Sequence, residues 1–217
     1  MKIFQSLLII LVSFSQIGNA EFEQIRGRKT FKYLSRLESE VLAELNLARQ
    51  NPKRYARFLE REKTFYVGRY LQRPGEVKIL TMEGVSAVDE AIRFLLSAKK
   101  ISPLKLSRGM SLGARDHVRD QGFKGSLGHK GSDGSLPWDR VSRYGKWKTT
   151  VGENIAYGRD TARDIVMGLI IDDGVADRGH RKNNFNSNFK IAGIAVGHHK
   201  TYGTMCVITF AGGFEER

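Results

Sequence analysis

Two apolar runs near the end of the chain decide its fold: "KIAGIAVG" at 190–197 and "GTMCVITFAGGF" at 203–214. Both runs are rich in β-branched and small apolar residues, and only the short segment "HHKTY" separates them. Apolar runs of this length, joined by a short polar loop, are typical of two neighbouring strands. The sequence therefore predicts a strand pair at the C-terminal end of the chain.

The residues before this strand pair have helical spacing. Apolar residues from Leu37 to Ala48 recur every three or four positions, and Pro52 suits the first turn of a second helix. Further helical patterns follow at 86–100 and at 158–174, and the segment 101–122 is predicted to be a short extended piece followed by a helix that ends near Gly122. Several helices followed by strands predict an α+β fold or a helix–sheet sandwich rather than a doubly wound sheet.

The first twenty residues, "MKIFQSLLIILVSFSQIGNA", have the pattern of a secretory signal. A lysine near the start, a short apolar middle and small residues before Glu21 are typical of such segments. An uncleaved membrane anchor is the alternative. We expect a signal at 1–20, a polar lead-in at 21–35 and one domain at 36–217. This organisation predicts an exported protein, either extracellular or periplasmic.

Charge, cysteine content and the absence of enzyme motifs limit the classes of function but identify no single partner. The formal net charge of +13 favours anionic surfaces such as phospholipid, acidic glycans or nucleic acid, although it is also compatible with a solvated basic face. Cys206 is the single cysteine, so an intramolecular disulfide is impossible, and its apolar neighbours predict a buried thiol. The chain lacks HExxH, GxSxG, P-loop and GxGxxG motifs, which argues against the enzyme classes that use them.

Three of the five histidines are predicted to be exposed. His117 is flanked by charged residues on a helix, while His198 and His199 fall in the loop between the two predicted strands. The other two lie in settings suited to a cleft. His129 stands in a loop rich in glycine and serine, and His180 directly follows Gly179.

Three acids accompany these two histidines in the polar segments: Glu153 in "VGENIAYG" and the neighbours Asp172 and Asp173 at a predicted helix end. Imidazole nitrogens and carboxylate oxygens suit a divalent ion such as zinc. A carboxylate can also fix the tautomer of a histidine and leave its second nitrogen free. Helix-ending acids and loop histidines are common, so ordinary loop roles stay open at this point.

Four segments in order resemble the CAP superfamily, also called SCP or TAPS. They are "GHKGSDGSLPWDRV" at 128–141, "VGENIAYG" at 151–158, "DDGVADRGHRKNNFNSNFKIAGIAVG" at 172–197 and "YGTMCVITFAGGF" at 202–214. The superfamily includes the cysteine-rich secretory proteins and the plant pathogenesis-related proteins of that type. The lead-in, the first helices and the absence of disulfides resemble its bacterial or protist branch.

The resemblance implies an α–β–α sandwich, with a small antiparallel sheet between helical layers and a central cleft lined by two histidines and two acids. His129, Glu153 and His180 match three of these positions. At the remaining position, a late helical glutamate in the family, this sequence has Asp172, with Asp173 as the alternative. In members that hold metal, the two histidines bind a divalent cation, often zinc.

Two function classes follow from the resemblance. The first is a binding module for a lipid or sterol, an anionic envelope or membrane surface, or a protein partner. The alternative is a zinc-dependent, protease-like hydrolase in which His129 and His180 are the metal ligands, Glu153 is the general base and Asp172 is the second candidate catalytic acid. Binding of nucleic acid or cell-wall glycan is less favoured. The oligomeric state stays open.

Overall fold

A four-stranded sheet forms the centre of the computed structural model, which describes residues 33–217. Its strand order is β4 (Lys105–Leu106), β6 (Ile191–His199), β7 (Gly203–Glu216) and β5 (Gly145–Tyr157). The long strands β6, β7 and β5 pair antiparallel, and the short β4 runs parallel to β6. The predicted strand pair is confirmed as β6 and β7. The predicted signal at 1–20 and most of the lead-in at 21–35 lie outside the described residues.

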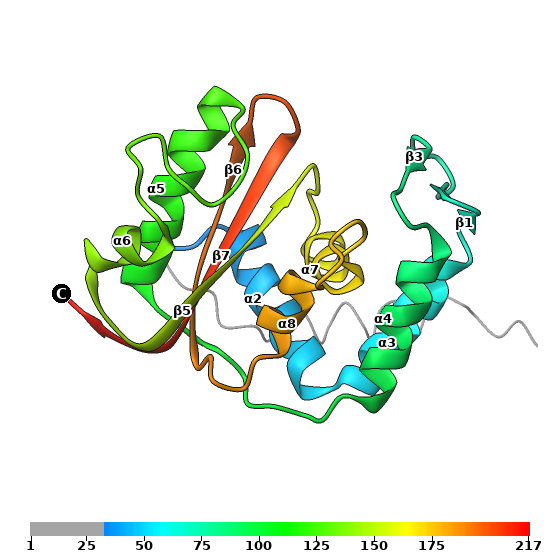
Figure 1. Ribbon diagram of the computed structural model, residues 1–217, viewed down its shortest axis with the longest axis horizontal. Helices are drawn as coiled ribbons and strands as arrows, with labels where there is room; N and C mark the ends of the chain where they lie inside the picture. Colours follow the sequence, from blue (N-terminus) through cyan, green and yellow to red (C-terminus); the bar gives the residue numbers. More distant parts are fainter. Residues whose placement is uncertain (1–32) are drawn as a thin grey trace, which may run out of the picture. The chain divides into compact units, whose positions relative to one another are not determined.

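Helices cover both faces of this sheet, as Figure 1 shows. α5 and α6 lie on one face, and α2, α7 and α8 lie on the other, with α3 and α4 beyond them. The α–β–α sandwich is thereby confirmed. The helices are α2 (Arg36–Gln50), α3 (Pro52–Lys63), α4 (Val85–Ser97), α5 (Arg108–Lys124), α6 (Pro137–Ser142), α7 (Ala162–Ile171) and α8 (Gly179–Phe185). Within residues 33–217, no helix combines the length and the apolar character needed to cross a bilayer.

Local sequence signals set several helix starts. Ser35 accepts a hydrogen bond from the Glu38 backbone N–H, and the Glu38 carboxylate accepts one from the Ser35 N–H, which completes a capping box for α2. Thr161 caps α7 in a similar way through the N–H of Asp164. These caps satisfy backbone donors that have no partner inside the helix.

The core follows the alternation of the strands. Ile194 and Ile208 are register partners and belong to the large apolar cluster shared with α2 and α7. Their neighbours Ala195 and Val207 also pair and point to the opposite face, where they join a second cluster under α5. Because successive strand residues face opposite sides, each strand contributes to both layers of the sandwich.

Glycines let α5 lie close to the sheet. A Cβ atom at Gly193 would stand 2.1 Å from the carbonyl carbon of Met110, and one at Gly122 would stand 2.2 Å from the His198 carbonyl oxygen. Both distances are far below a van der Waals contact, so neither position tolerates a side chain without movement of the backbone opposite. A Cβ atom at Gly197, the second glycine of "GIAVG" in β6, would likewise stand 2.5 Å from Cγ1 of Val118 on α5.

A second sheet, here called the small sheet, was not predicted. It comprises β1 (Tyr66–Val67), β2 (Tyr70–Leu71) and β3 (Ile79–Leu80), paired antiparallel in chain order between α3 and α4. The strands are only two residues long, and most residues from 67 to 80 are exposed. In Figure 1 the small sheet stands at the side of the molecule away from α5. Such short strands give almost no periodic signal in the sequence.

Arg49, at the end of α2, is fully buried and has no carboxylate partner among the described residues. Its Nε donates to the carbonyl oxygen of Ser102 at 3.0 Å, and Nη2 donates to that of Phe189 at 3.1 Å. Nη1 donates to the carbonyl oxygens of Asn184 at 2.7 Å and Asn186 at 3.2 Å. Burial lowers the pKa of Arg49 to about 10. This guanidinium joins α2, the segment before β4 and the turn between α8 and β6.

Replacing Arg49 by Met should lower the free energy of unfolding by on the order of 3 kcal/mol, because several buried carbonyl groups lose their donor. Urea unfolding followed by circular dichroism measures the change. Arg54→Met is the matched control, since Arg54 is exposed on α3 and its side chain has no hydrogen bond in the described chain. Equal stability of the two variants would contradict the role assigned to Arg49.

Candidate functional site

The first element of the candidate site is a contact between His129 and Glu153. Glu153 lies on β5, and its Oε1 is 3.0 Å from His129 Nδ1 in the loop between α5 and α6. Arg140 of α6 donates through Nη2 to both carboxylate oxygens of Glu153, at 2.9 and 2.8 Å. Its Nη1 donates to the carbonyl oxygen of His129 at 3.0 Å. Arg140 therefore holds the carboxylate and the loop that carries the histidine.

The second element is a contact between His180 and Asp172. Asp172 ends α7 in the left-handed conformation, with φ at 58°. Its Oδ1 lies 2.6 Å from His180 Nδ1, and its Oδ2 accepts from the backbone N–H groups of His180 at 2.9 Å and Arg181 at 3.2 Å. Asp173 instead accepts from the N–H groups of Met82 and Glu83. Asp172, the acid preferred from the sequence, is thus the one that contacts His180.

The two histidines have the same arrangement. An ionised carboxylate can only accept hydrogen bonds, so each Nδ1 carries the proton and each neutral ring leaves Nε2 as an acceptor. Neither Nε2 has a hydrogen bond within residues 33–217. The side chains of His129 and His180 are 47% and 25% exposed, whereas those of Glu153 and Asp172 are 1% exposed. The imidazoles are therefore the groups that a ligand can reach.

Asn154 connects the two elements. It is the neighbour of Glu153 on β5, and strand alternation points its side chain to the opposite face. Its Nδ2 donates to the His180 carbonyl oxygen at 3.0 Å and to Asn184 Oδ1 at 2.9 Å, while its Oδ1 accepts from Asn183 at 2.9 Å. One edge strand thus positions Glu153 on one side and the helix that carries His180 on the other.

The predicted cleft residues come together as two pairs. Within the described chain, no group of three or more histidine, cysteine, aspartate or glutamate side chains could hold a metal ion. His129 lines a hollow of about 300 Å³ together with Trp138 and Val151. His180 lines a different cavity of about 210 Å³. The resemblance to the CAP superfamily had implied one shared cleft for all four residues.

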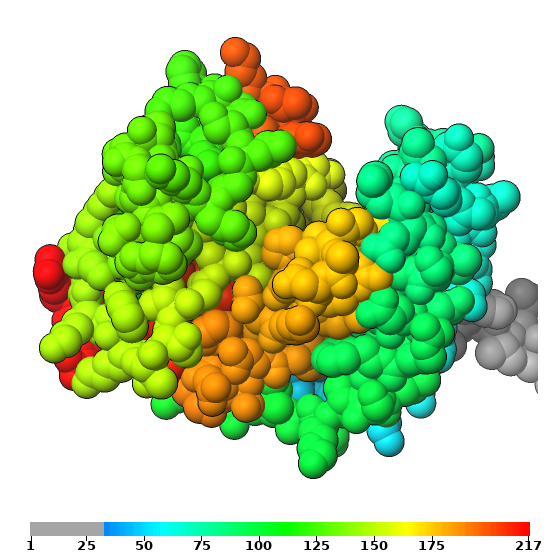
Figure 2. All heavy atoms as spheres, in the orientation of Figure 1, coloured from blue at the N-terminus to red at the C-terminus, as the bar shows by residue number. Residues whose placement is uncertain are grey.

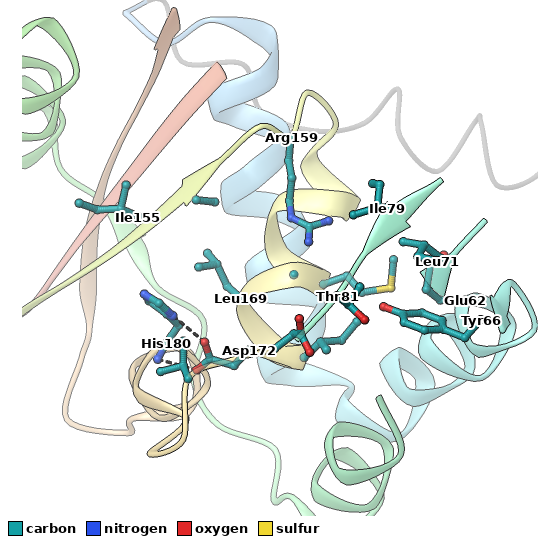
Figure 3. Close-up of a pocket in the computed structure, with 16 residues that line it drawn as sticks. Glu62, Tyr66, Leu71, Ile79, Thr81, Ile155, Arg159, Leu169, Asp172 and His180 are labelled. Carbon is teal, nitrogen blue, oxygen red and sulfur yellow. Dashed lines mark hydrogen bonds and ion pairs between the residues drawn. The ribbon is translucent and has the colours of Figure 1, made fainter. Parts of the chain in front are cut away.

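The cavity beside His180 lies between α7, the end of β5 and the small sheet. Figure 3 shows His180 and Asp172 at one side, with Arg159, Leu71 and Ile79 at the other. Figure 2 shows the surface hollowed between the small sheet, in cyan, and the yellow and orange segments opposite it. This cavity is accessible from the surface and has both apolar and charged walls.

Two of the remaining histidines contradict the prediction that they are exposed. His117 and His199 are fully buried, whereas His198 is exposed as predicted. His117 Nε2 donates to the Gly128 carbonyl oxygen at 2.9 Å, and His199 Nε2 is 3.0 Å from the carbonyl oxygen of Ser126. Both histidines support the loop that carries His129. The charged neighbours of His117 did not reveal which face of α5 meets the sheet.

Arg181 is a buried connection beside the site, and the expectation of a buried Cys206 is confirmed. Arg181 pairs with Glu90 at 2.8 Å and also donates to the carbonyl oxygens of Ile170 and Ile171. Cys206 is buried, and burial raises the pKa of its thiol far above the ordinary range. Sequence reasoning missed Arg140 and Asn154, because neither stands in a pattern that separates a buried site residue from a surface one.

Comparison with known proteins identifies the family. Residues 42–210 match the family model described as "CAP: Cysteine-rich secretory protein family". The chain belongs to the CAP family. The model spans α5, β5, α7, α8 and β6, and therefore all four predicted site residues.

The similarity to individual CAP relatives is partial. The chain is 30% identical over 114 residues to the uncharacterized protein YkwD of Bacillus subtilis (strain 168). These matched residues make up 51% of this chain and 42% of that protein. The chain thus spans less than half the length of that relative.

Two solved structures are also similar to this CAP domain. An outer surface protein from Borrelia burgdorferi is 14% identical, with a TM-score of 0.44 over 54% of this chain and 80% of that one. An extracellular protein containing a SCP domain from Bacillus anthracis str. Ames is 18% identical, with a TM-score of 0.42 over 58% of this chain and 37% of that one. Similarity of this degree says nothing about ligand or activity.

His117 should make the CAP domain sensitive to acid. Its Nδ1 is buried without a hydrogen-bond partner, and burial lowers its pKa below the usual 6.5. The unfolded chain therefore binds a proton more readily, so the contribution of His117 to stability is complete above pH 6.5 and declines as the pH falls below it.

We expect the free energy of unfolding to fall more steeply from pH 7.5 to pH 5 in the wild type than in His117→Gln. Glutamine keeps a donor for the Gly128 carbonyl group but does not titrate. For one proton the difference in slope can reach about 1.4 kcal/mol per pH unit. Urea unfolding at several pH values measures it, and parallel slopes would argue against a proton-sensitive His117.

Proposed function

We propose that this CAP domain is an exported, non-catalytic binding module whose accessible recognition groups are the imidazoles of His129 and His180. The observation that carries the proposal is the contrast in exposure: both histidines reach solvent, while their acids are almost fully covered. The signal-like pattern at 1–20 and the secretory description of the family support export. Its ligand would be a lipid, an envelope surface or a protein.

The same contrast weighs against the hydrolase alternative. A general base must approach the water or the group whose proton it takes. The Glu153 side chain is 1% exposed, and both of its oxygens accept hydrogen bonds from the buried Arg140. Asp172 is equally covered and accepts from two backbone N–H groups. This geometry favours a role for both acids in orienting a histidine.

The residues present could hold a divalent cation only at a site where the protein supplies some of the ligands and leaves other coordination positions open. A carboxylate on Nδ1 and a free Nε2 form the arrangement found around histidine ligands of zinc. Two imidazole nitrogens are fewer than the four ligands of a closed structural zinc site. A bound cation would therefore keep positions for water or for a ligand, and it would supply Lewis acidity there. At either histidine the free Nε2 would be the ligand, with Glu153 orienting His129 and Asp172 orienting His180.

Zinc titration tests the role of the histidines. Calorimetry on chelator-treated protein should show binding at micromolar affinity, lost in His129→Ala and in His180→Ala if one ion is shared. His198→Ala is the control, because His198 is an exposed histidine near the end of β6, outside the two histidine–acid pairs. Absence of binding by the wild type, or equal binding by all variants, would remove metal from the proposal.

A second candidate function, attachment to an anionic lipid surface, is supported by the exposed face of the small sheet. Val67, Val77, Leu80 and Met82 are exposed there, and the side chain of Val77 is 85% exposed. Arg69 and Lys78 lie beside them, and the Lys78 ammonium stands 4.0 Å from the centre of the Tyr70 ring. Exposed apolar side chains next to cations suit an interface with negatively charged headgroups.

The double variant Val77→Asp/Leu80→Asp should bind vesicles that contain phosphatidylglycerol at least about tenfold less than the wild type, because each change removes apolar insertion and adds a negative charge. Vesicle sedimentation at increasing salt measures binding, which should weaken as salt rises. Phe123→Asp is the matched control, since Phe123 is equally exposed, at 85%, at the end of α5. Equal binding to uncharged phosphatidylcholine vesicles would contradict this mode.

A further inference from the structure

The cavity between α7 and the small sheet contains a cation with no assigned partner. In the part of the chain that the structure describes, seven arginine side chains make no hydrogen bond or ion pair. Six of them are exposed: Arg54, Arg57, Arg61, Arg93, Arg108 and Arg119. Arg159 differs, because it is half-buried and lines the cavity. A partly desolvated guanidinium with unused donors favours an anionic ligand.

The fold reserves space for this side chain. Arg159 lies against Gly168 of α7, where a Cβ atom would stand 2.5 Å from its Nε and 2.7 Å from its Cζ. Gly168 has ordinary helical geometry, so a turn does not explain why the residue is glycine. The lack of a side chain instead lets the guanidinium approach α7 closely. In Figure 3 the Arg159 side chain extends over α7 toward Leu169 and Ile79.

The acids around the cavity are already engaged. Both oxygens of Glu62 accept hydrogen bonds from Arg73. Asp172 and Asp173 accept from His180 and from backbone N–H groups, as described above. Asp164 and Arg159 attract each other electrostatically without contact, because the direct partners of Asp164 are Arg73 and Thr161. The charge of Arg159 is therefore the one in this cavity without a direct counter-ion.

The rest of the wall suits a small apolar group. Leu71, Ile79, Met167, Leu169 and Val175 line the cavity. Its volume of about 210 Å³ exceeds the roughly 150 Å³ of an engineered protein cavity that binds benzene.

Tyr66 adds a second donor in the same cavity. Burial, followed by the charge of Glu62, raises the pKa of Tyr66 to about 12, so its hydroxyl keeps its proton. In Figure 3 this hydroxyl points into the cavity. The cavity thus offers both a protonated phenol and a guanidinium as donors to an anionic ligand.

We propose that this cavity binds a small carboxylic acid whose carboxylate contacts Arg159 and whose apolar part, about the size of a six-carbon chain or a benzene ring, packs against the small sheet and α7. The proposal goes beyond metal or surface binding. Since His180 and Asp172 line the same cavity, the test is made in the presence of a chelator, which separates the two proposals.

Calorimetric titrations with hexanoate, hexanol and hexylamine test the charge preference. We expect hexanoate to bind at least about tenfold more tightly than hexanol, because charge-assisted hydrogen bonds discriminate by this amount or more. Hexylamine should bind no better than hexanol. In Arg159→Gln, hexanoate should fall to the affinity of hexanol, whereas Arg119→Gln, the matched loss of an exposed unpaired arginine, should leave it unchanged.

Gly168→Ala is an independent variant that retains Arg159 but forces its guanidinium away from α7; it should also weaken hexanoate binding. Thermal unfolding verifies that each variant is folded.

His129→Ala should keep hexanoate binding even if it loses zinc. Failure of hexanoate to bind, equal binding of hexanoate and hexanol, or wild-type affinity in Arg159→Gln would overturn the proposal. A steady rise in affinity through laurate would overturn the size limit and indicate a lipid.

Discussion

The buried guanidinium of Arg49 connects parts of the chain that lie far apart in the sequence. Its donors reach carbonyl oxygens in the segment before β4, in α8 and in the turn that leads to β6. A buried cation without a carboxylate partner is stable only if backbone dipoles replace the water it has lost. Any movement of α8 away from α2 would remove some of these acceptors, so Arg49 fixes one end of the helix that begins beside His180.

The other side of α8 is fixed by β5 and α7. Asn154 holds the His180 carbonyl group, and Asp172 holds its backbone N–H and its ring. Because Asn154 follows Glu153 directly, the pairing of β5 with β7 positions both histidine–acid pairs at once. The site is thus assembled from an edge strand and two short connections, and its geometry depends on the buried side chains of Asn154 and Arg140, which hold the backbone of the two histidines.

Much of this organisation could be predicted from the sequence. The β6–β7 pair has a clear strand pattern, α2 and α7 have helical spacing, and Asp172 was preferred over Asp173. His117, Arg140 and the small sheet could not be predicted in this way. A histidine between charged residues can face a sheet, and an arginine can be buried when it pairs with a carboxylate on a distant element. Two-residue strands are too short to show a periodic pattern. These features arise from tertiary packing, which a local pattern does not record.

The net charge of +13 overstates the basic character of the surface. Arg49 and Arg140 are buried against carbonyl groups or a carboxylate, and Arg181 is almost as deeply enclosed. Such arginines act as internal connectors, since the planar guanidinium can serve several acceptors in fixed directions. Charge that is used inside the fold cannot attract a partner. Arg159, half-buried and without a direct counter-ion, is therefore more informative about ligands than the total charge.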